Sequence, residues 1–250
     1  MNDYESAIKW LNRYLGGVPV AGGNNETVQE SENSNLYKAH LLLGKSHLAM
    51  GNLKEACDAL QKTAATAVDS EDYIEAISSL VEAQTKEQDF VAALSVIENV
   101  RSRPFSQQQV TRLLLLKSGV LREMGLADKA ITILTEKIQY ISDNRLKADI
   151  ALELARCYYT GQNLESARKY YTDAIFLLEP GAASQQASCE LAEVSLKLGD
   201  NEQAVSICTK LVDSSTQPQT KQAASKILAS AYSNLKQYDK AAQILIMASK

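Results

Sequence analysis

The two histidines, His40 and His47, have the side chains best suited to bind a metal ion or to act as a general base. They are seven residues apart in a segment that we expect to be helical, so about 10 Å of helix axis separates them. One zinc ion cannot hold both, since its bonds to nitrogen are only about 2 Å long. The sequence also places no nucleophile or carboxylate pair beside them. The spacing therefore predicts packed or half-buried histidines, with no catalytic residue and no metal ligand.

Cysteines and glycine-rich loops are the other features that could support chemistry. The cysteines are scattered without a Cys-x-x-Cys spacing, which predicts reduced, buried thiols in an intracellular protein. The segment "LGKSH" (43–47) lacks the upstream glycine and the strand that a phosphate-binding loop requires, so we expect no cofactor. The four cysteines are Cys57, Cys157, Cys189 and Cys208.

The overall composition is that of an ordinary globular protein. The chain has 250 residues, 45% hydrophobic and 22% charged, with a net charge of −4. This acidic balance does not predict the basic surface that binds nucleic acid. The longest apolar run, "LLLL" (113–116), is far shorter than the roughly 20 residues that cross a membrane. The first residues, "MNDYESAIKW", lack the apolar core of a secretory signal. We expect a cytoplasmic protein without membrane insertion.

An internal repeat organises nearly the whole chain. Alanine recurs every 37 residues, and such a fixed period identifies a repeat architecture. Four residues after each alanine stands a bulky or apolar side chain, twelve residues before it most copies have a small residue, and most copies have a glycine between the two runs. Sparse glycine and proline with abundant Ala, Leu, Lys, Glu and Gln favour helix throughout. The repeated alanines are Ala56, Ala93, Ala130, Ala167, Ala204 and Ala241, and the hinge glycines are Gly51, Gly125, Gly161 and Gly199.

This pattern resembles the tetratricopeptide repeat family. The best copy joins "LARCYY" (154–159) to "NLESARKYYTDAI" (163–175), and the next best joins "LASAY" (228–232) to "YDKAAQILIMA" (238–248). The period exceeds the usual 34 residues, and the tryptophan of the family's first helix is missing. The resemblance implies an all-α, right-handed superhelical solenoid of antiparallel helix pairs, with about six and a half repeats. Small side chains at each crossing let the paired helices approach closely.

The same register divides the chain. Residues 1–15 match the second helix of an incomplete first repeat, residues 16–35 form a flexible loop rich in Gly, Asn, Glu and Ser, and residues 36–250 form six helical hairpins. This arrangement favours a segment of a longer array, whose uncapped ends could self-associate. The predicted helices span 3–15, 36–50, 53–66, 70–86, 88–101, 106–124, 127–141, 144–160, 164–178, 183–198, 201–213, 218–235 and 238–249.

The concave wall of such a solenoid is the expected binding surface. In the family, particular first-helix positions line this wall, and the charged clamp that some members use for a terminal carboxylate is absent here. Three arginines from successive repeats favour a partner peptide or helix that is acidic. The candidate groove residues are Lys38, Lys45, Arg112, Arg122, Arg156, Tyr159 and Lys226.

These observations favour a non-enzymatic protein–protein interaction scaffold. We expect it to act as an adaptor that organises a multi-subunit complex through its concave groove. The alternative is a regulatory or targeting arm of an enzyme encoded elsewhere in a longer chain. A third class, the single-strand RNA readers built from helical pairs, requires a basic groove that this acidic chain does not offer.

Overall fold

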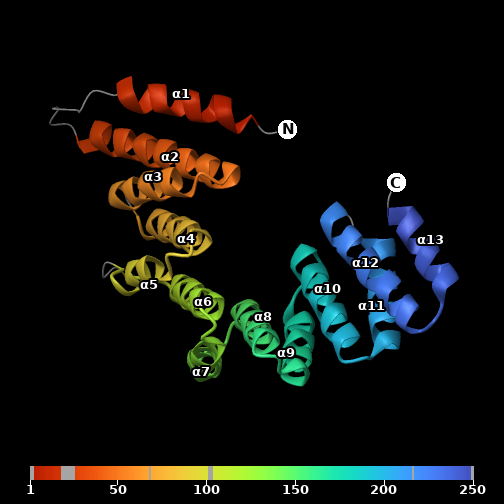
Figure 1. The fold of residues 1–250 in the computed structure, drawn as a ribbon. Helices are drawn as coiled ribbons and strands as arrows, with labels where there is room; N and C mark the ends of the chain where they lie inside the picture. The colour runs from red at the N-terminus through yellow and green to blue at the C-terminus, as the bar shows by residue number, and fades with distance from the viewer. Residues whose placement is uncertain (1–2, 18–25, 68, 101–103, 216, 249–250) are drawn as a thin grey trace. The chain divides into compact units, whose positions relative to one another are not determined.

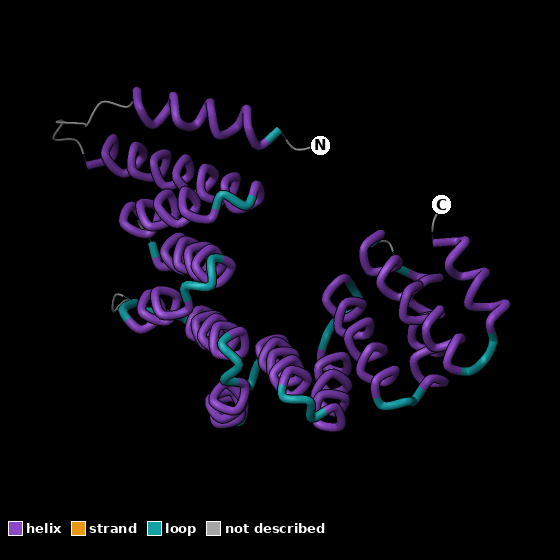
Figure 2. Tube along the Cα trace, in the orientation of Figure 1, coloured by secondary structure: helices purple, strands orange, loops and turns teal. Residues whose placement is uncertain are grey.

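The computed structural model describes residues 3–17, 26–67, 69–100, 104–215 and 217–248. These residues form helices joined by short turns, with no strand among them (Figures 1 and 2). The helices are α1 (Tyr4–Gly17), α2 (Glu26–Met50), α3 (Leu53–Thr66), α4 (Ser70–Lys86), α5 (Phe90–Glu98), α6 (Gln107–Glu123), α7 (Ala127–Ile138), α8 (Asn144–Thr160), α9 (Leu164–Leu177), α10 (Ala182–Lys197), α11 (Asn201–Ser214), α12 (Pro218–Asn234) and α13 (Tyr238–Ala248).

Most helix boundaries agree with the sequence prediction to within one or two residues, and the start signals explain several of them. Ser106 and Gln109 form a capping box at the beginning of α6. Pro218 begins α12, where its missing N–H costs nothing. The clearest error is at α2, which begins at Glu26 and not at residue 36. The predicted loop 16–35 is therefore helical from residue 26 onward, and residues 18–25 lie outside the described part of the chain.

The chain forms two compact units, residues 1–124 and 125–250. In the first unit, α2, α3, α4 and α5 pack in sequence around a core that includes Leu60, Tyr73 and Ile77. In the second, α8 to α11 surround a core that includes Leu152, Tyr171 and Leu191, and α11 to α13 continue the packing. The third predicted hairpin, α6 with α7, falls on either side of this division.

The repeated alanines are buried in every copy. Each of the six is at most 5% exposed. Such burial is required of a residue at a close helix crossing. The small residues twelve positions earlier, such as Ser118 and Ala155, are fully buried as well. An all-α solenoid of stacked helix pairs is therefore confirmed, and the 37-residue register is correct.

The hinges between paired helices share one backbone conformation. Six residues with positive φ recur at intervals of 37, three of them glycine and three of them not. Gly161 lies in the turn between α8 and α9, as predicted, with φ of −74°, and the next residue, Gln162, adopts the left-handed conformation. Positive φ favours glycine, so the non-glycine copies carry local strain. The six positions are Gly51, Gln88, Gly125, Gln162, Gly199 and Lys236.

Candidate functional site

All seven candidate groove residues lie on the first helix of a hairpin, as the register predicted. The first unit contains Lys38 and Lys45 on α2 and Arg112 and Arg122 on α6, and the second contains Arg156 and Tyr159 on α8 and Lys226 on α12. The partners of these side chains within each unit decide which of them are available to a ligand.

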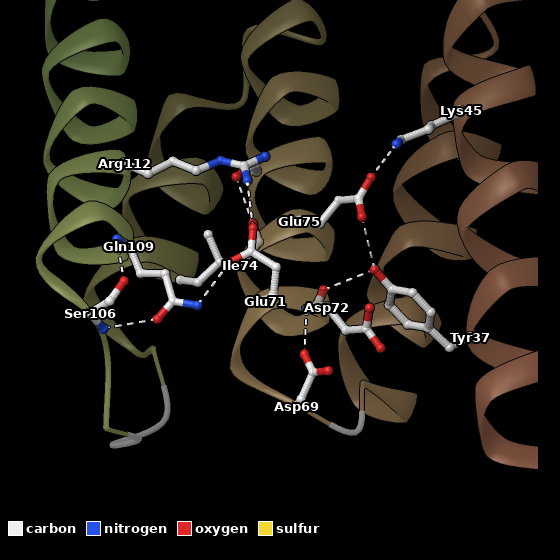
Figure 3. Close-up of polar contacts among 11 residues, drawn as sticks. Tyr37, Lys45, Asp69, Glu71, Asp72, Ile74, Glu75, Ser106, Gln109 and Arg112 are labelled. Atoms are coloured by element: carbon white, nitrogen blue, oxygen red, sulfur yellow. Dashed lines mark hydrogen bonds and ion pairs between the residues drawn. The ribbon is translucent and has the colours of Figure 1, made fainter. Parts of the chain in front are cut away.

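Two glutamates on α4 connect this helix to both of its neighbours (Figure 3). Glu75 points toward α2, where Lys45 Nζ donates to its Oε1 at 2.6 Å. The hydrogen bond from Lys45 lowers the pKa of the Glu75 carboxyl. Glu71, one turn earlier, points toward α6 and accepts from Gln109 Nε2 at 2.9 Å. Helix α4 thus contacts the first helices on both sides of it, α2 and α6, through acidic side chains.

Tyr37 adds a second contact between α2 and α4. Its hydroxyl donates to the backbone carbonyl oxygen of Asp72 at 3.0 Å and lies 3.4 Å from Glu75 Oε2. Burial, followed by the nearby carboxylates, raises the pKa of the Tyr37 phenol. This hydroxyl therefore stays protonated and acts as a donor.

In the second unit, Arg156 on α8 binds Glu190 on α10 through two parallel hydrogen bonds. Its Nε and Nη2 donate to the two carboxylate oxygens at 3.0 Å each. Glu190 also accepts from Gln186 Nε2 at 3.0 Å. A bidentate arginine–carboxylate pair is among the stronger polar contacts in proteins. The charge of Arg156 is therefore largely neutralised within the chain.

Tyr159 lies one turn beyond Arg156 and makes a similar set of contacts to α10. Its hydroxyl donates to the Glu193 carboxylate and accepts from Lys197 Nζ. The Lys197 ammonium also lies 4.2 Å from the centroid of the Tyr159 ring. Burial, together with the Glu193 hydrogen bond, raises the pKa of the Tyr159 phenol. The aromatic ring is half-buried and its hydroxyl already has partners.

The remaining candidates form ion pairs within the first unit or lie exposed on helix surfaces. Arg112 Nη1 lies 3.7 Å from Glu71 Oε1, and both side chains are well exposed, so this ion pair is weak. Arg122 pairs with the adjacent Glu123 at 2.7 Å. Lys38 and Lys226 are exposed on the surface of α2 and α12.

A groove of about 520 Å³ lies between α4 and α6 in the first unit. Its lining is mostly apolar and also includes Arg112 and Arg122, together with Lys86 and Glu82, which are paired with each other at 2.8 Å. It thus combines apolar surface with two arginines from the candidate set. The apolar part of the lining includes Val81, Leu115, Leu116, Gly119 and Val120.

The polar contacts between neighbouring first helices were not predicted from the sequence. Arg156 and Glu190 are 34 residues apart, and so are Tyr159 and Glu193. This separation is three residues shorter than the 37-residue repeat. A polar or charged residue with a glutamate at this separation on the next first helix was the available signal. The groove itself depends on side-chain shape and had no comparable signal.

Other site chemistry finds little support in the described residues. No group of three or more His, Cys, Asp or Glu side chains is placed to hold a metal ion in that part of the chain. The four cysteines are free, and all but the half-buried Cys57 are buried, as expected. Burial raises the pKa of the Cys208 thiol to about 12, so it is protonated and unreactive. Across the ranges described, none of the helices is long and apolar enough to span a bilayer.

Comparison with known proteins agrees with this fold. A family model described as tetratricopeptide repeat matches residues 38–70, which comprise most of α2, all of α3 and the first residue of α4. None of the curated proteins compared matches the chain. The resemblance to the tetratricopeptide repeat family is therefore confirmed.

Several solved structures are similar in fold at low identity. BtubC (BKLC) from P. vanneervenii has a TM-score of 0.63 at 18% identity, covering 80% of this chain and 87% of that one. The tetratricopeptide repeat protein TTC0263 from Thermus thermophilus has a TM-score of 0.58 at 16% identity, covering 77% and 98%. A Rap protein complexed with competence and sporulation factor has a TM-score of 0.60 at 14% identity, covering 88% and 77%. At these identities the likeness shows the fold.

Proposed function

We propose that this protein is a non-enzymatic binding scaffold that takes up a segment of a partner protein in the groove between α4 and α6. The observation that supports this most directly is that mostly apolar side chains line the groove together with Arg112 and Arg122. Curved stacks of helix pairs commonly present binding surfaces of this kind. The Rap structure, which holds a competence and sporulation factor, is an example of a similar fold with a bound partner.

The groove favours a short segment that has one or two bulky apolar side chains beside a carboxylate. Leu115 and Leu116 offer the apolar contact, and burying such side chains contributes about 25 cal/mol per Å². Arg112 and Arg122 lie ten residues apart on α6, about 15 Å along the axis, so an acidic residue can pair with either one. The weak contact of Arg112 with Glu71 leaves its guanidinium able to exchange partners.

The other candidates are assigned supporting roles. Lys38 and Lys45 extend the first-helix face of the first unit, and Arg156, Tyr159 and Lys226 belong to that of the second. Arg156 and Tyr159 already form hydrogen bonds to α10. We therefore assign them a structural role in the scaffold as well as a role in ligand contact. Several such faces on one chain suit an adaptor that organises a complex, and the buried free thiols suit an intracellular setting.

A random peptide library displayed on phage and selected on the intact chain tests this proposal. We expect enriched peptides with bulky apolar residues next to Asp or Glu. Titration calorimetry with the selected peptides should then show a loss of at least about tenfold in affinity for the variant Arg112→Glu with Arg122→Glu, about 1.4 kcal/mol or more.

The matched control is Arg145→Glu with Arg168→Glu, which reverses two charges on exposed arginines of the second unit. This variant should keep the affinity of the parent chain. Selected peptides that bind the Arg112→Glu, Arg122→Glu variant as tightly as the parent would place the binding elsewhere and contradict the proposal.

A further inference from the structure

Gly119 lies in the interior of α6 and lines the groove between α4 and α6. Glycine in a helix interior lowers stability relative to alanine, since it loses more conformational freedom on folding. A glycine at such a place usually has a packing or a functional reason. The residues at the equivalent positions of the second unit indicate which of the two applies here.

The groove between α4 and α6 corresponds to the contact between α8 and α10, because the two places are separated by two periods of 37 residues. Four residues of the groove lining are thus equivalent to four residues that connect α8 with α10. The equivalent pairs are Glu82 with Arg156, Thr85 with Tyr159, Leu116 with Glu190 and Gly119 with Glu193.

In the second unit these four side chains bridge the two helices. Arg156 donates two hydrogen bonds of 3.0 Å each to Glu190, and the Tyr159 hydroxyl donates to the Glu193 carboxylate. Side chains of α8 and α10 therefore meet in the space between these helices.

The first unit cannot form either bridge. Leu116 has no polar atom in its side chain, and Gly119 has no side chain. Thr85 is short, and its hydroxyl donates to the carbonyl oxygen of Val81 in its own helix at 2.6 Å. The space that Tyr159 and Glu193 bridge in the second unit is therefore part of an open groove in the first.

We propose that Gly119 determines which partner segment the groove accepts, because a bulky apolar side chain of the partner packs against its bare backbone. This inference rests on the proposed function of the groove. The side chain is of leucine or aromatic size and takes the place that Tyr159 and Glu193 fill in the second unit. Leu115 and Leu116, on the same helix, supply the apolar surface beside it.

The two arginines of the groove fix where the carboxylates of this segment lie. Arg122 is within one turn of Gly119, so an acidic residue next to the bulky side chain reaches it. Arg112 is seven residues before Gly119, about 10.5 Å along the helix axis. An extended chain rises about 3.3 Å per residue, so an acidic residue about three positions from the bulky side chain reaches Arg112.

Titration calorimetry of the peptides selected by phage display, with Gly119→Leu and Gly119→Ala, tests the inference. We expect Gly119→Leu to bind at least about tenfold more weakly than the parent, since a filled pocket cannot accept the same side chain. Gly119→Ala adds one methyl group and should lose less affinity. Both variants should melt at or above the temperature of the parent, since leucine and alanine favour a helix more than glycine does.

A shortened peptide locates the contact at residue 119. In this peptide alanine replaces the bulky residue, so the side chain that Gly119→Leu would displace is gone. We expect the shortened peptide to bind the parent and Gly119→Leu with equal affinity. Such a departure from additivity is the signature of two groups in direct contact.

The matched control is Ser230→Leu, at the equivalent position of α12, where the side chain is exposed. This variant should keep the affinity of the parent. The inference alone would be overturned if Gly119→Leu bound the selected peptides as tightly as the parent, or lost the same factor with the shortened peptide. A lower melting temperature in both Gly119 variants would identify a packing glycine and overturn it too. Peptides that bind the Arg112→Glu, Arg122→Glu variant as tightly as the parent would overturn the proposed function together with this inference.

Discussion

Gly44 in α2 lies so close to Leu60 in α3 that a Cβ atom at residue 44 would fall 2.5 Å from Leu60 Cγ. Overpacking of this kind costs about 1–3 kcal/mol, while replacing a helical glycine by alanine gains about 1 kcal/mol. We therefore expect Gly44→Ala to lower the free energy of unfolding by about 1 kcal/mol in urea denaturation.

The contact between the two side chains can be tested by removing Leu60. In a Leu60→Ala background the clash is gone and only the helix propensity remains, so Gly44→Ala should become stabilising by up to about 1 kcal/mol. A Gly44→Ala substitution that stabilises the parent chain would show that the crossing has room to spare.

The three hinges without glycine predict sites where the chain can be made more stable. Gln162 has φ of 60°, a conformation that costs a non-glycine residue about 1–2 kcal/mol. Glycine removes this strain and loses about 0.5–1 kcal/mol through its greater freedom in the unfolded chain. Gln162→Gly should therefore raise the free energy of unfolding by about 0.5–1 kcal/mol, measured by thermal or urea denaturation.

Neighbouring substitutions separate this effect from a general change in the turn. Gly161 has negative φ, and an added Cβ would meet no atom closer than the Cys157 carbonyl oxygen at 3.4 Å, so Gly161→Ala should be nearly neutral. Gly199 has φ of 81°, so Gly199→Gln should destabilise the chain. If Gly161→Ala proved the more harmful of these two, the hinge assignment would be wrong.

The fold could be predicted from the sequence because a single constraint recurs in every copy. A close helix crossing requires a small residue, and each buried alanine, such as Ala130 or Ala204, repeats that requirement at a constant interval. The first ten residues of α2 were missed, since "ETVQESENSN" is polar apart from Val28 and offers no apolar periodicity. The left-handed residue of the turn after α8, Gln162, carried no sequence signal, because it is not a glycine.

The binding face was only partly predictable. Repeat register placed Arg112, Arg156 and the other candidates on first helices, since register follows from the period. Which of them bind their own chain depends on side-chain rotamers and on neighbouring helices, as the pair of Arg156 with Glu190 illustrates.

Packing at the centre of the second unit predicts the effect of enlarging a repeated alanine. Ala167 is fully buried between α8 and α9, in the core that contains Ala155 and Tyr171. Ala167→Leu should overpack this crossing and lower the free energy of unfolding by about 1–3 kcal/mol. Ala223→Leu, on the exposed face of α12, is the control and should change stability by less than about 0.5 kcal/mol. Equal melting curves for the parent and Ala167→Leu would count against the register.

The pair of Arg156 with Glu190 predicts a dependence of stability on pH. Burial raises the pKa of the Glu190 carboxyl, but the hydrogen bonds and charge of Arg156 outweigh burial and hold that pKa below its usual range. A carboxyl whose pKa is lower in the folded chain stabilises it above the unfolded pKa of about 4.3. This contribution is lost as pH falls through the folded value.

Glu190→Gln removes the charge while keeping the shape of the side chain. It should lower the free energy of unfolding by about 1–3 kcal/mol at pH 7, since hydrogen bonds to charged groups contribute amounts of this size. The difference between parent and variant should shrink as pH falls from about 5 toward 3, because the parent then loses the same charge. Urea denaturation across this pH range measures both effects.

The control for this experiment is Glu165→Gln, which breaks an ion pair with Arg168 on the surface of α9. Glu165 is 66% exposed at its side chain, and exposed pairs contribute little, so we expect a change below about 1 kcal/mol at pH 7. Arg156→Lys should lie between the parent and Glu190→Gln, since lysine keeps the charge but cannot form two parallel hydrogen bonds. If Glu190→Gln were as stable as the parent at pH 7, the ion pair between α8 and α10 would contribute nothing to the free energy of unfolding, and apolar packing alone would hold the two helices together.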